Sequence, residues 1–567
     1  MTKVMHIGPK NKKIDDQLQA GRREAEERDA QRRADKLKLP YIDLRPTPVQ
    51  VEALGLVDEE KARAAQCAPV TMRRKDVIIA AYDPAIPAIA KIVKDLTEKG
   101  YHPMLVVCSL NSLAIAWASY RYVIKRGVKI TGEVELSAKD VSEAQEKFKS
   151  LKDISRSIEE FSEAQASQLL NLVLLGAAVS RASDIHIEPS SGGGRLRYRI
   201  DGELNDIGSF SDKKISSLTS RIKLISGLKL NVKNEAQDGR FTIKLREKNV
   251  EIRTSMIPSE YGETIVLRLL DPETISVEIK ELGFRAEELE VVIKALARPN
   301  GMILNTGPTG SGKTSTLYAF IRHLYNPSIK IITIEDPIEY HVEGISQTQV
   351  DSKSGYTFAN GLRSILRQDP DAVLVGEIRD LETAEIALHA ALTGQVVFST
   401  LHTNSAAGAI PRLVDMGVKP QIIGPAFNMV IAQRLVRKLC PHCKKPQEIT
   451  PELRKSLQSF VATLPDRIHP PDIKTLQLWQ PTPSGCDQCH NGYKGRIGIF
   501  ELFLMSPKIE ELVHDQAAEV VIGRTAAEAG MITMQQDGIL KVCEGITSLD
   551  EVASITGTLI FEKEERV

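Results

Sequence analysis

The chain has 567 residues, of which 42% are hydrophobic and 26% charged, and its 74 Lys and Arg residues balance its 74 Asp and Glu residues. This length exceeds what one hydrophobic core supports, so we expect several globular domains. The neutral balance and the 5% aromatic content argue against a strongly basic nucleic-acid-binding protein. The first residues lack a secretory signal pattern and no apolar run predicts a membrane span, so a cytosolic protein is expected.

The first third of the chain contains one predicted small domain between two charged segments. Residues 1–38 are dense in charged side chains without an apolar stripe, which predicts a charged N-terminal arm, either a solvated helix or a mobile segment. Residues 39–125 alternate apolar runs such as Val77–Ala81 with helical segments such as Ala88–Lys99, which indicates a small α/β domain suited to docking. Residues 126–160 are polar and are interpreted as a linker with helical content.

A second N-terminal domain is predicted over residues 161–272. It begins with an apolar helix at Leu169–Val179 and continues with strand-like segments such as Arg195–Ile200 and Val250–Met256. Alternating polar residues on these strands predict a half-exposed sheet. Residues 273–281 follow as a linker in which we expect a hinge.

The last predicted domain, residues 282–567, contains a phosphate-binding motif. Its apolar runs alternate with helical stretches, which predicts a parallel sheet covered by helices. The segment Gly307-Pro-Thr-Gly-Ser-Gly-Lys-Thr314 matches the template G-x-x-x-x-G-K-[ST] and lies between an apolar run and a helix-like segment, as the motif requires. The predicted nucleotide-binding residues are Gly307, Pro308, Thr309, Gly310, Ser311, Gly312, Lys313, Thr314 and Ser315.

Each part of this motif has a separate chemical role. Glycines allow successive backbone N–H groups to face phosphate oxygens at a helix N-terminus. Lys313 supplies a cation for the β- and γ-phosphates, and Thr314 offers a hydroxyl to Mg²⁺. The sequence therefore predicts binding of a nucleoside triphosphate, taken to be ATP, with Mg²⁺.

Acidic residues follow two further apolar runs of the same domain. Glu339 lies in the segment after the first run, and Glu377 directly follows Gly376 after the second. The carboxyl ends of parallel strands are where ligands bind, so both acids are candidates for the site. Gly376 stands where an ordinary P-loop ATPase has a metal-binding aspartate, so Mg²⁺ is expected on Thr314 and water, with help from Glu339 or Asp336. Glu377 is predicted to polarise the attacking water.

A third apolar run is followed by His402, which is predicted to sense the γ-phosphate through hydrogen bonds. A structural histidine remains the alternative interpretation of that residue.

Four cysteines form two C-x-x-C pairs inside this domain, at Cys440, Cys443, Cys486 and Cys489. Four thiolates in two close pairs suit tetrahedral Zn²⁺ in a structural role. We therefore predict a zinc-binding insertion over residues 436–495. His442 and His490 are neighbouring alternatives as ligands.

The motifs together resemble the secretion ATPase superfamily, in the branch that powers type II secretion and type IV pilus assembly. The phosphate loop, the Asp box (Ile332–Tyr340), the atypical Walker B segment ending in Glu377 and the His box (Thr393–Arg412) occur in family order. The resemblance covers roughly residues 161–556. It implies a RecA-like P-loop NTPase core and a PAS-like second N-terminal domain. It also implies that arginines approach the nucleotide: Arg253, Arg268, Arg363, Arg367 and Arg496.

The same resemblance implies a hexameric motor at the cytoplasmic face of the inner membrane. Its expected partners are an inner-membrane platform protein and pilin-like assembly machinery, with membrane association through these partners and no nucleic acid. Pilus assembly, type II secretion and a conjugative pilus remain open as the machine that it serves. Pilus retraction, a nucleic-acid translocase and a regulatory nucleotide-binding protein are the alternative functions.

Overall fold

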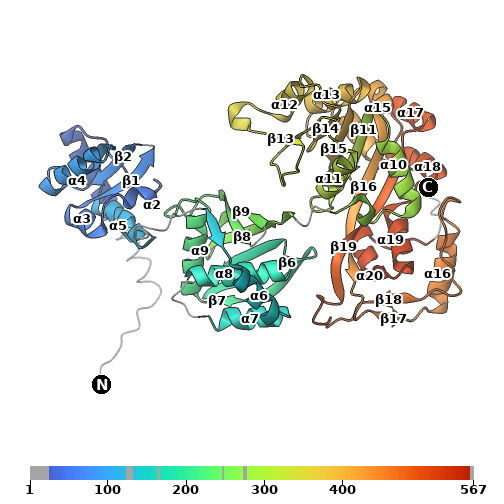
Figure 1. Ribbon diagram of the computed structural model, residues 1–567, viewed down its shortest axis with the longest axis horizontal. Helices are drawn as coiled ribbons and strands as arrows, with labels where there is room; N and C mark the ends of the chain where they lie inside the picture. The colour runs from blue at the N-terminus through green and yellow to red at the C-terminus, as the bar shows by residue number, and fades with distance from the viewer. Residues whose placement is uncertain are drawn as a thin grey trace. The chain divides into compact units, whose positions relative to one another are not determined.

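The computed structural model describes residues 24–73, 75–122, 132–161, 166–245, 248–272 and 277–561. The chain divides into two compact units, an N-terminal unit (Met1–Leu269) and a C-terminal unit (Leu270–Val567) (Figure 1). Within the described ranges, none of the helices combines the length and hydropathy that crossing a membrane requires.

The N-terminal unit begins with a helix over residues 24–37, while residues 1–23 of the predicted arm lie outside the described ranges. One face of this helix is not solvated, because Ala30 and Ala34 are buried. Glu27 on the same helix accepts hydrogen bonds from the hydroxyls of Tyr41 at 2.7 Å and Ser109 at 2.6 Å. Most of this helix is exposed, as a solvated helix predicts, but the face with the alanines packs against the first small domain, which the composition did not indicate.

A three-stranded sheet forms the first small domain, as the apolar runs predict. Its strands are β1 (Cys67–Arg73), β2 (Asp76–Ala81) and β3 (His102–Val107), and its helices are α2 (Val51–Leu54), α3 (Glu59–Ala64), α4 (Pro87–Glu98) and α5 (Leu110–Ala118). The pair β1–β2 is antiparallel and the pair β2–β3 is parallel.

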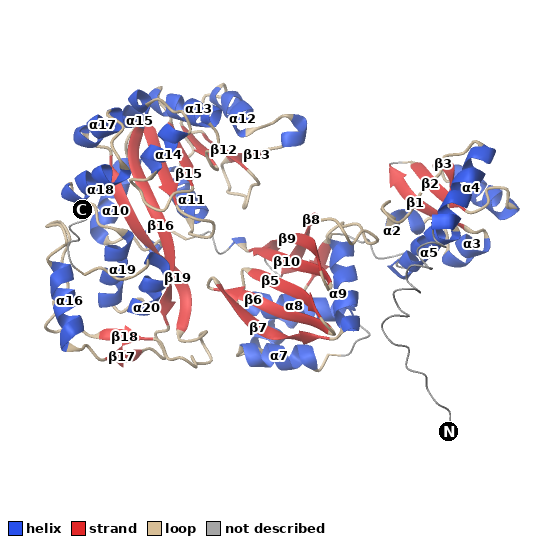
Figure 2. Cartoon of the chain, turned by 180° about the vertical axis from the view of Figure 1, so that it is seen from behind, coloured by secondary structure: helices blue, strands red, loops and turns tan. Residues whose placement is uncertain are grey.

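A seven-stranded sheet with the order β4-β8-β9-β10-β5-β6-β7 forms the rest of the N-terminal unit. Its strands are β4 (Glu133–Glu135), β5 (Asp184–Ser190), β6 (Gly193–Ile200), β7 (Glu203–Phe210), β8 (Gln237–Leu245), β9 (Lys248–Ser259) and β10 (Gly262–Leu270). Helices α8 (Ala166–Val179) and α9 (Asp212–Ile225) pack against each other, and α8 covers one face of the sheet (Figures 1 and 2).

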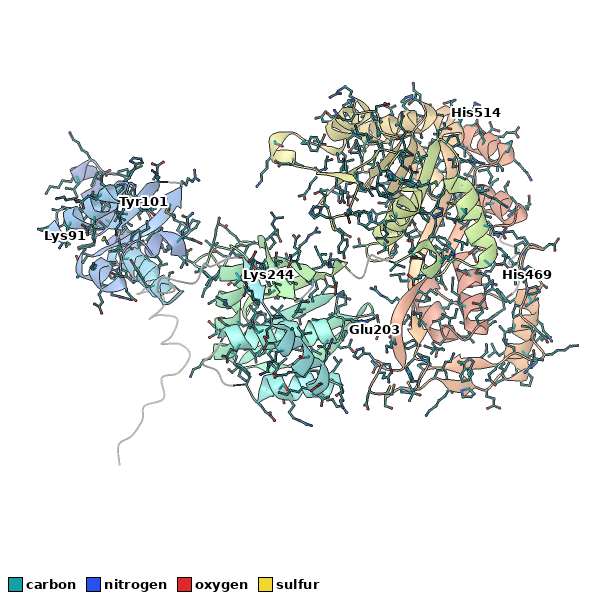
Figure 3. The ribbon with its side chains drawn as sticks, in the orientation of Figure 1. Lys91, Tyr101, Glu203, Lys244, His469 and His514 are labelled. Carbon is teal, nitrogen blue, oxygen red and sulfur yellow. The ribbon has the colours of Figure 1, made fainter. Side chains whose placement is uncertain are left out.

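The segment predicted as a linker, residues 126–160, instead contributes to this domain where it is described. It contains β4, α6 (Ala138–Lys147) and α7 (Leu151–Glu159). Ile154 and Ile158 of α7 are buried in the same core as the residues of α8. Lys244 of β8, labelled in Figure 3, forms an ion pair of 2.7 Å with Glu133 of β4. The segment is highly charged on average, which predicted a linker. Its few apolar residues recur at helical spacing, however, and this allows its helices to pack into the core.

The C-terminal unit is built on a second seven-stranded sheet with the order β13-β12-β14-β15-β11-β16-β19. Its strands are β11 (Gly301–Thr306), β12 (Ile331–Glu335), β13 (Ser346–Gln349), β14 (Ala372–Val375), β15 (Val396–Leu401), β16 (Phe427–Leu439) and β19 (Tyr493–Leu504). All neighbouring pairs are parallel except the edge pair β16–β19. Every residue of β11, β12, β14 and β15 is buried, as expected for a parallel sheet covered on both faces.

Two hydrophobic cores cover the two faces of this sheet. One contains residues of α12 (Phe358–Leu366), α13 (Leu381–Leu392), α14 (Ala409–Asp415), α15 (Pro420–Ala426), α17 (Pro507–His514) and α18 (Glu519–Glu528). The other contains residues of α10 (Ala286–Leu296) and α11 (Lys313–Leu324). The layered arrangement agrees with the predicted α/β class.

The strands β16 and β19 are long neighbours that extend from the sheet to the cysteine insertion (Figure 2). The insertion contains β17 (Lys445–Gln447), α16 (Pro451–Val461) and β18 (Leu478–Gln480). It packs with α19 (Met534–Cys543) and α20 (Leu549–Thr556) in a separate core that includes Phe460 and Ile539. Residues 436–439 and 493–495 belong to β16 and β19, so the insertion is shorter at both margins than the predicted 436–495.

The predicted hinge, residues 273–281, is described only from residue 277 onward. The short helix η3 (Ile279–Glu281) belongs to the core of the C-terminal unit through the buried Ile279. Arg322 of α11 donates a hydrogen bond of 2.8 Å to the carbonyl of Val277. The end of the predicted hinge is therefore fixed to the C-terminal unit, and a hinge at residues 273–276 stays a prediction.

Candidate active site and metal centre

The predicted phosphate loop connects the end of β11 with the start of α11. Gly310 and Gly312 have φ values of +81° and +90°, in the left-handed region that favours glycine. A Cβ atom at Gly312 would lie 2.8 Å from Nε2 of Gln433, and one at Gly307 would lie 2.6 Å from the Gln433 carbonyl oxygen. Gly310 is thus required by its backbone conformation, and Gly307 and Gly312 by the lack of space for a side chain as well.

Lys313 is the buried cation of this loop. Its Nζ donates hydrogen bonds to the carbonyls of Gly307 at 2.7 Å and Pro308 at 3.0 Å. The pKa of Lys313 is lowered to about 8, chiefly by burial and also by the charge of Arg434, while the charges of Glu377 and Glu339 oppose the change. Both predicted acids are therefore close enough to interact with the ammonium group that the phosphates would contact.

Glu377 follows β14 and lies beside His402, which follows β15. The Nε2 atom of His402 is 3.5 Å from Oε2 of Glu377, whose other oxygen forms an ion pair with Arg379. The Glu377 side chain is only 14% exposed, whereas that of His402 is 53% exposed. A half-buried carboxylate beside an open imidazole is suited to orienting a water molecule.

Gly376 brings neighbouring strands close together at this point. Its carbonyl accepts a hydrogen bond of 2.7 Å from the Thr400 hydroxyl, and its N–H donates to the Ile334 carbonyl at 2.8 Å. A Cβ atom at this position would lie 3.3 Å from the Ile334 carbonyl oxygen. The close packing gives a reason for glycine where other P-loop ATPases have an acid.

The Asp box contains a buried carboxylate, Glu335, at the end of β12. It accepts hydrogen bonds from the hydroxyls of Tyr318 and Thr333 and from the side-chain amide of Gln347 at 3.2 Å. Burial, together with the charge of Glu335, raises the pKa of Tyr318 above its usual value. Because Tyr318 belongs to α11, these contacts connect the helix of the phosphate loop with the Asp box.

A polar group on β16 was missed by the sequence analysis. Gln433 is buried, and its Oε1 accepts hydrogen bonds of 2.9 Å from Asn305 of β11 and from Thr316 of α11. The next residue, Arg434, lies against Gly307, since its Nη1 would be 3.1 Å from a Cβ atom there. The signal was present in the sequence as a polar pair within the otherwise apolar run Met429–Val436.

Of the five arginines predicted to contact the nucleotide, three belong to the C-terminal unit and two to the N-terminal unit. Arg363 forms an ion pair of 2.7 Å with Glu382, and Arg367 donates to the Arg363 carbonyl at 3.0 Å. Arg496 is exposed on β19, opposite Arg437 of β16. Arg253 and Arg268 belong to the N-terminal unit, where Arg268 contacts Asp184 at 2.8 Å. Contact of these five arginines with a nucleotide stays a prediction.

The four predicted zinc ligands come together as a cluster. Their Sγ atoms all lie within 4.8 Å of one another, with 3.8 Å between Cys440 and Cys486 and 3.5 Å between Cys443 and Cys489. A tetrahedron with zinc–sulfur bonds of about 2.3 Å has sulfur–sulfur edges of about 3.8 Å. The cysteine geometry therefore fits a Zn²⁺ ion.

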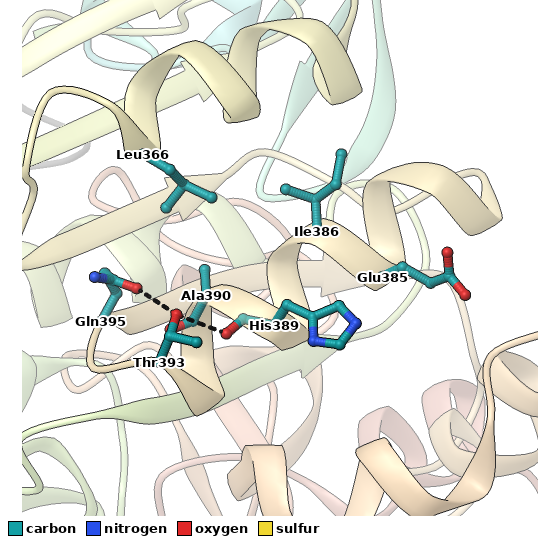
Figure 4. A pocket seen from close by; sticks show the side chains of 7 residues that line it. All are labelled: Leu366, Glu385, Ile386, His389, Ala390, Thr393 and Gln395. Atoms are coloured by element: carbon teal, nitrogen blue, oxygen red, sulfur yellow. Dashed lines mark hydrogen bonds between the residues drawn. The ribbon is translucent and has the colours of Figure 1, made fainter.

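A surface pocket of about 380 Å³ lies elsewhere in the C-terminal unit (Figure 4). Its lining residues are Leu366, Glu385, Ile386, His389, Ala390, Thr393 and Gln395. Thr393 and Gln395 directly precede β15, whereas the phosphate loop follows the carboxyl end of the parallel neighbour β11. The pocket is therefore at the opposite edge of the sheet from the phosphate loop.

Comparison with known proteins gives two family matches. Residues 159–554 match the model described as "Type II/IV secretion system protein", and residues 37–123 match the MshEN domain. Among solved structures, the Yersinia pseudotuberculosis ATPase DotB is similar to this chain with a TM-score of 0.50 and 18% sequence identity. The aligned region covers 69% of this chain and 93% of the DotB chain. This structural likeness concerns the fold alone.

Two named relatives are similar over different lengths. "Type II secretion system protein E" of Aeromonas hydrophila is 45% identical over 395 residues, which are 70% of this chain and 76% of that protein. "Type IV pilus assembly ATPase PilB" of Myxococcus xanthus is 37% identical over 521 residues, 91% of this chain and 89% of that protein. The chain belongs to the type II/IV secretion system protein family and is an ATPase with a RecA-like core.

Proposed function

We propose that this ATPase powers type IV pilus assembly. The observation that carries the proposal is the length of the similarity. The two PilB relatives, from Myxococcus xanthus and Pseudomonas aeruginosa, align over 91% and 92% of the chain. The type II secretion relatives of Aeromonas hydrophila and Vibrio cholerae align over 70%.

In the proposed reaction, the phosphate loop holds the nucleotide and Glu377 polarises the attacking water. Lys313 stabilises negative charge that develops on the β- and γ-phosphates. His402 senses the γ-phosphate from its position next to Glu377. Glu339, whose charge acts on Lys313, is the second acid of the site.

Magnesium is the proposed metal at the nucleotide, where it would neutralise phosphate charge. Thr314, half-buried at the start of α11, is the residue that would hold it. Arg253 and Arg268 of the N-terminal unit, together with Arg363, Arg367 and Arg496, are the proposed additional phosphate contacts. Arginine suits that role because its planar fork grips two oxygens at once.

The cysteine cluster is proposed as a structural Zn²⁺ site. A closed set of four thiolates leaves no open position for a substrate, so the metal would stabilise the insertion without taking part in hydrolysis. The distances between the sulfurs support this proposal.

The proposed working form is a ring of six subunits at the cytoplasmic face of the inner membrane. Hydrolysis would change the angle between the two units through the linker at residues 273–276 and so drive a membrane platform protein. The first small domain would dock onto platform or regulatory partners. No nucleic acid is expected as a partner, because the chain is electrically neutral.

Type II secretion is the second candidate function. The higher identity of 45% to protein E of Aeromonas hydrophila over 395 residues favours it. Pilus retraction and nucleic-acid translocation are weaker alternatives, since retraction relatives usually lack the four cysteines and the chain has no basic excess.

Deletion of the gene separates the two main candidates. We expect loss of surface pili with normal secretion of enzymes, and recovery of pili when the wild-type gene is returned. A Lys313→Ala gene expressed at the same level is the matched control and should not restore them. Intact pili with enzymes retained inside the cell would assign the protein to type II secretion.

A further inference from the structure

Arg434 is placed at the phosphate loop by β16. Its backbone lies in the antiparallel ribbon with β19, opposite Ile499, and its guanidinium reaches the beginning of the phosphate loop. The Nη1 group donates a hydrogen bond of 3.0 Å to the Gln433 carbonyl, the same oxygen that a Cβ atom at Gly307 would meet. The arginine thus packs on the backbone that is expected to surround the phosphates.

The second nitrogen of the same guanidinium bonds to a different loop. Nη2 donates to the side-chain oxygen of Asn404 at 3.1 Å and to its carbonyl at 3.4 Å. Asn404 is two residues after His402, in the loop that follows β15. Next to it, Thr403 bonds to Thr306 at the end of β11, with 2.7 Å between the hydroxyl oxygens. One side chain therefore contacts both the phosphate loop region and the loop that carries His402.

Arg434 is half-buried and lies near a buried carboxylate. Burial lowers its pKa, and the buried Glu501 of β19 opposes this change. Glu501 also accepts a hydrogen bond of 2.8 Å from the Ala406 N–H, in the same loop as His402 and Asn404.

We propose that Arg434 is a positioning residue of the ATPase reaction, which holds the loop of His402 in register with the phosphate loop through Asn404. Its two bonds require a planar fork, because a single ammonium cannot donate in both directions with the same geometry. The proposal rests on the assignment of Glu377 and His402 to hydrolysis, and it adds a residue from a strand outside the four motifs.

The first test compares two arginines of the same strand. Arg434→Lys should lower kcat about tenfold while KM for ATP stays within about twofold, since binding by the phosphate loop is retained. Arg437→Lys is the matched control, because Arg437 is on the same strand and bonds to Glu551 of α20. The control should lower Tm without changing kcat. A kcat for Arg434→Lys within twofold of wild type would overturn the proposal.

A double-mutant cycle separates positioning from general stabilisation of the fold. If Arg434 acts through Asn404, Asn404→Ala should lower kcat to a similar extent. The kcat of the double variant should then be about tenfold below that of the wild type, and no lower. Independent effects, giving about a hundredfold loss in the double variant, would contradict the proposed connection. Single-turnover hydrolysis by Glu377→Gln, measured alongside, shows separately whether the catalytic assignment holds.

The pH dependence of nucleotide binding provides a readout that loop packing alone would not change. The groups that act on Lys313 are Arg434, which lowers its pKa, and Glu377 and Glu339, which raise it. Wild-type affinity for ATP should fall as pH rises through about 8, where Lys313 loses its proton. In Arg434→Met this fall should move to higher pH, because one nearby positive charge is removed. An unchanged profile would place Arg434 too far from Lys313 for the proposed role.

Discussion

The two ends of the β16–β19 ribbon differ in what their side chains contact. At the nucleotide end, Gln433 bonds to the helix that follows the phosphate loop, and Arg434 bonds to the loop after β15. At the other end, Arg437 bonds to Glu551 of α20 and stacks 4.2 Å from the ring centre of Tyr493, just before the cysteines. The comparison indicates that one pair of strands supports hydrolysis at one end and stability at the other.

Lys313→Ala should produce the largest effect at the nucleotide end. Removing the buried ammonium group leaves the phosphates without their principal cation, so ATP binding or turnover should be lost. Binding is measured by titration with a fluorescent ATP analogue, and turnover by phosphate release. Normal turnover by this variant would refute the location of the site.

Disruption of the cysteine cluster should act at the other end of the ribbon. Cys443→Ser, or removal of metal by a strong chelator, should lower Tm by several degrees because the insertion loses its central contact. Zinc content, measured by atomic absorption, should fall from one ion per chain. Cys543→Ser is the control, since Cys543 lies outside the cluster. A full loss of ATP binding at a temperature where the variant is folded would contradict the division between the two ends.

The smallest predicted effect is on the pH dependence of stability, and it concerns Phe500 of β19, which lies opposite Gln433. The N–H of Phe500 on β19 donates to Asp537 of α19, which lies near the fully buried Glu288 of α10. Burial, together with Asp537, raises the pKa of Glu288 from 4.5 to about 8. Lys541, Arg467 and Arg285 are the nearby cations that partly oppose the increase.

The folded chain therefore keeps a proton on Glu288 that the unfolded chain releases above about pH 4.5. Stability supplied by this proton is present at low pH and is lost as pH rises towards 8. Glu288→Gln, which needs no proton, should gain in Tm relative to wild type across this interval. Glu290→Gln, an exposed residue of the same helix, is the control. A constant difference in Tm between pH 5 and pH 8.5 would contradict a protonated Glu288.

The motifs allowed much of the C-terminal unit to be predicted. The glycines, Lys313 and the cysteines each have a residue type that their chemistry requires at a fixed spacing, so the sequence indicated the loop and the cluster that they form, while the role of Glu377 stays a prediction. Gln433 and Arg434 were missed because their function depends on β16 lying beside β11, and the sequence does not show which strands are neighbours.

The N-terminal unit was predicted less well. Residues 132–160 and 24–37 are highly charged, yet α7 and the first helix each bury a narrow face through residues such as Ile154 and Ala30. In such helices a few apolar side chains at helical spacing decide the packing, while average composition describes only the solvated face. Composition therefore predicted a charged arm and a linker where the chain forms part of a core.

The most direct test of the account is to measure ATP binding and hydrolysis by the Glu377→Gln variant. This change removes the carboxylate that polarises water but keeps the shape of the side chain and the phosphate loop. We predict that the variant binds ATP with wild-type affinity and hydrolyses it at least about a hundredfold more slowly in a single turnover. Hydrolysis at the wild-type rate would contradict the account and would transfer the role to another acid, with Glu339 the first candidate.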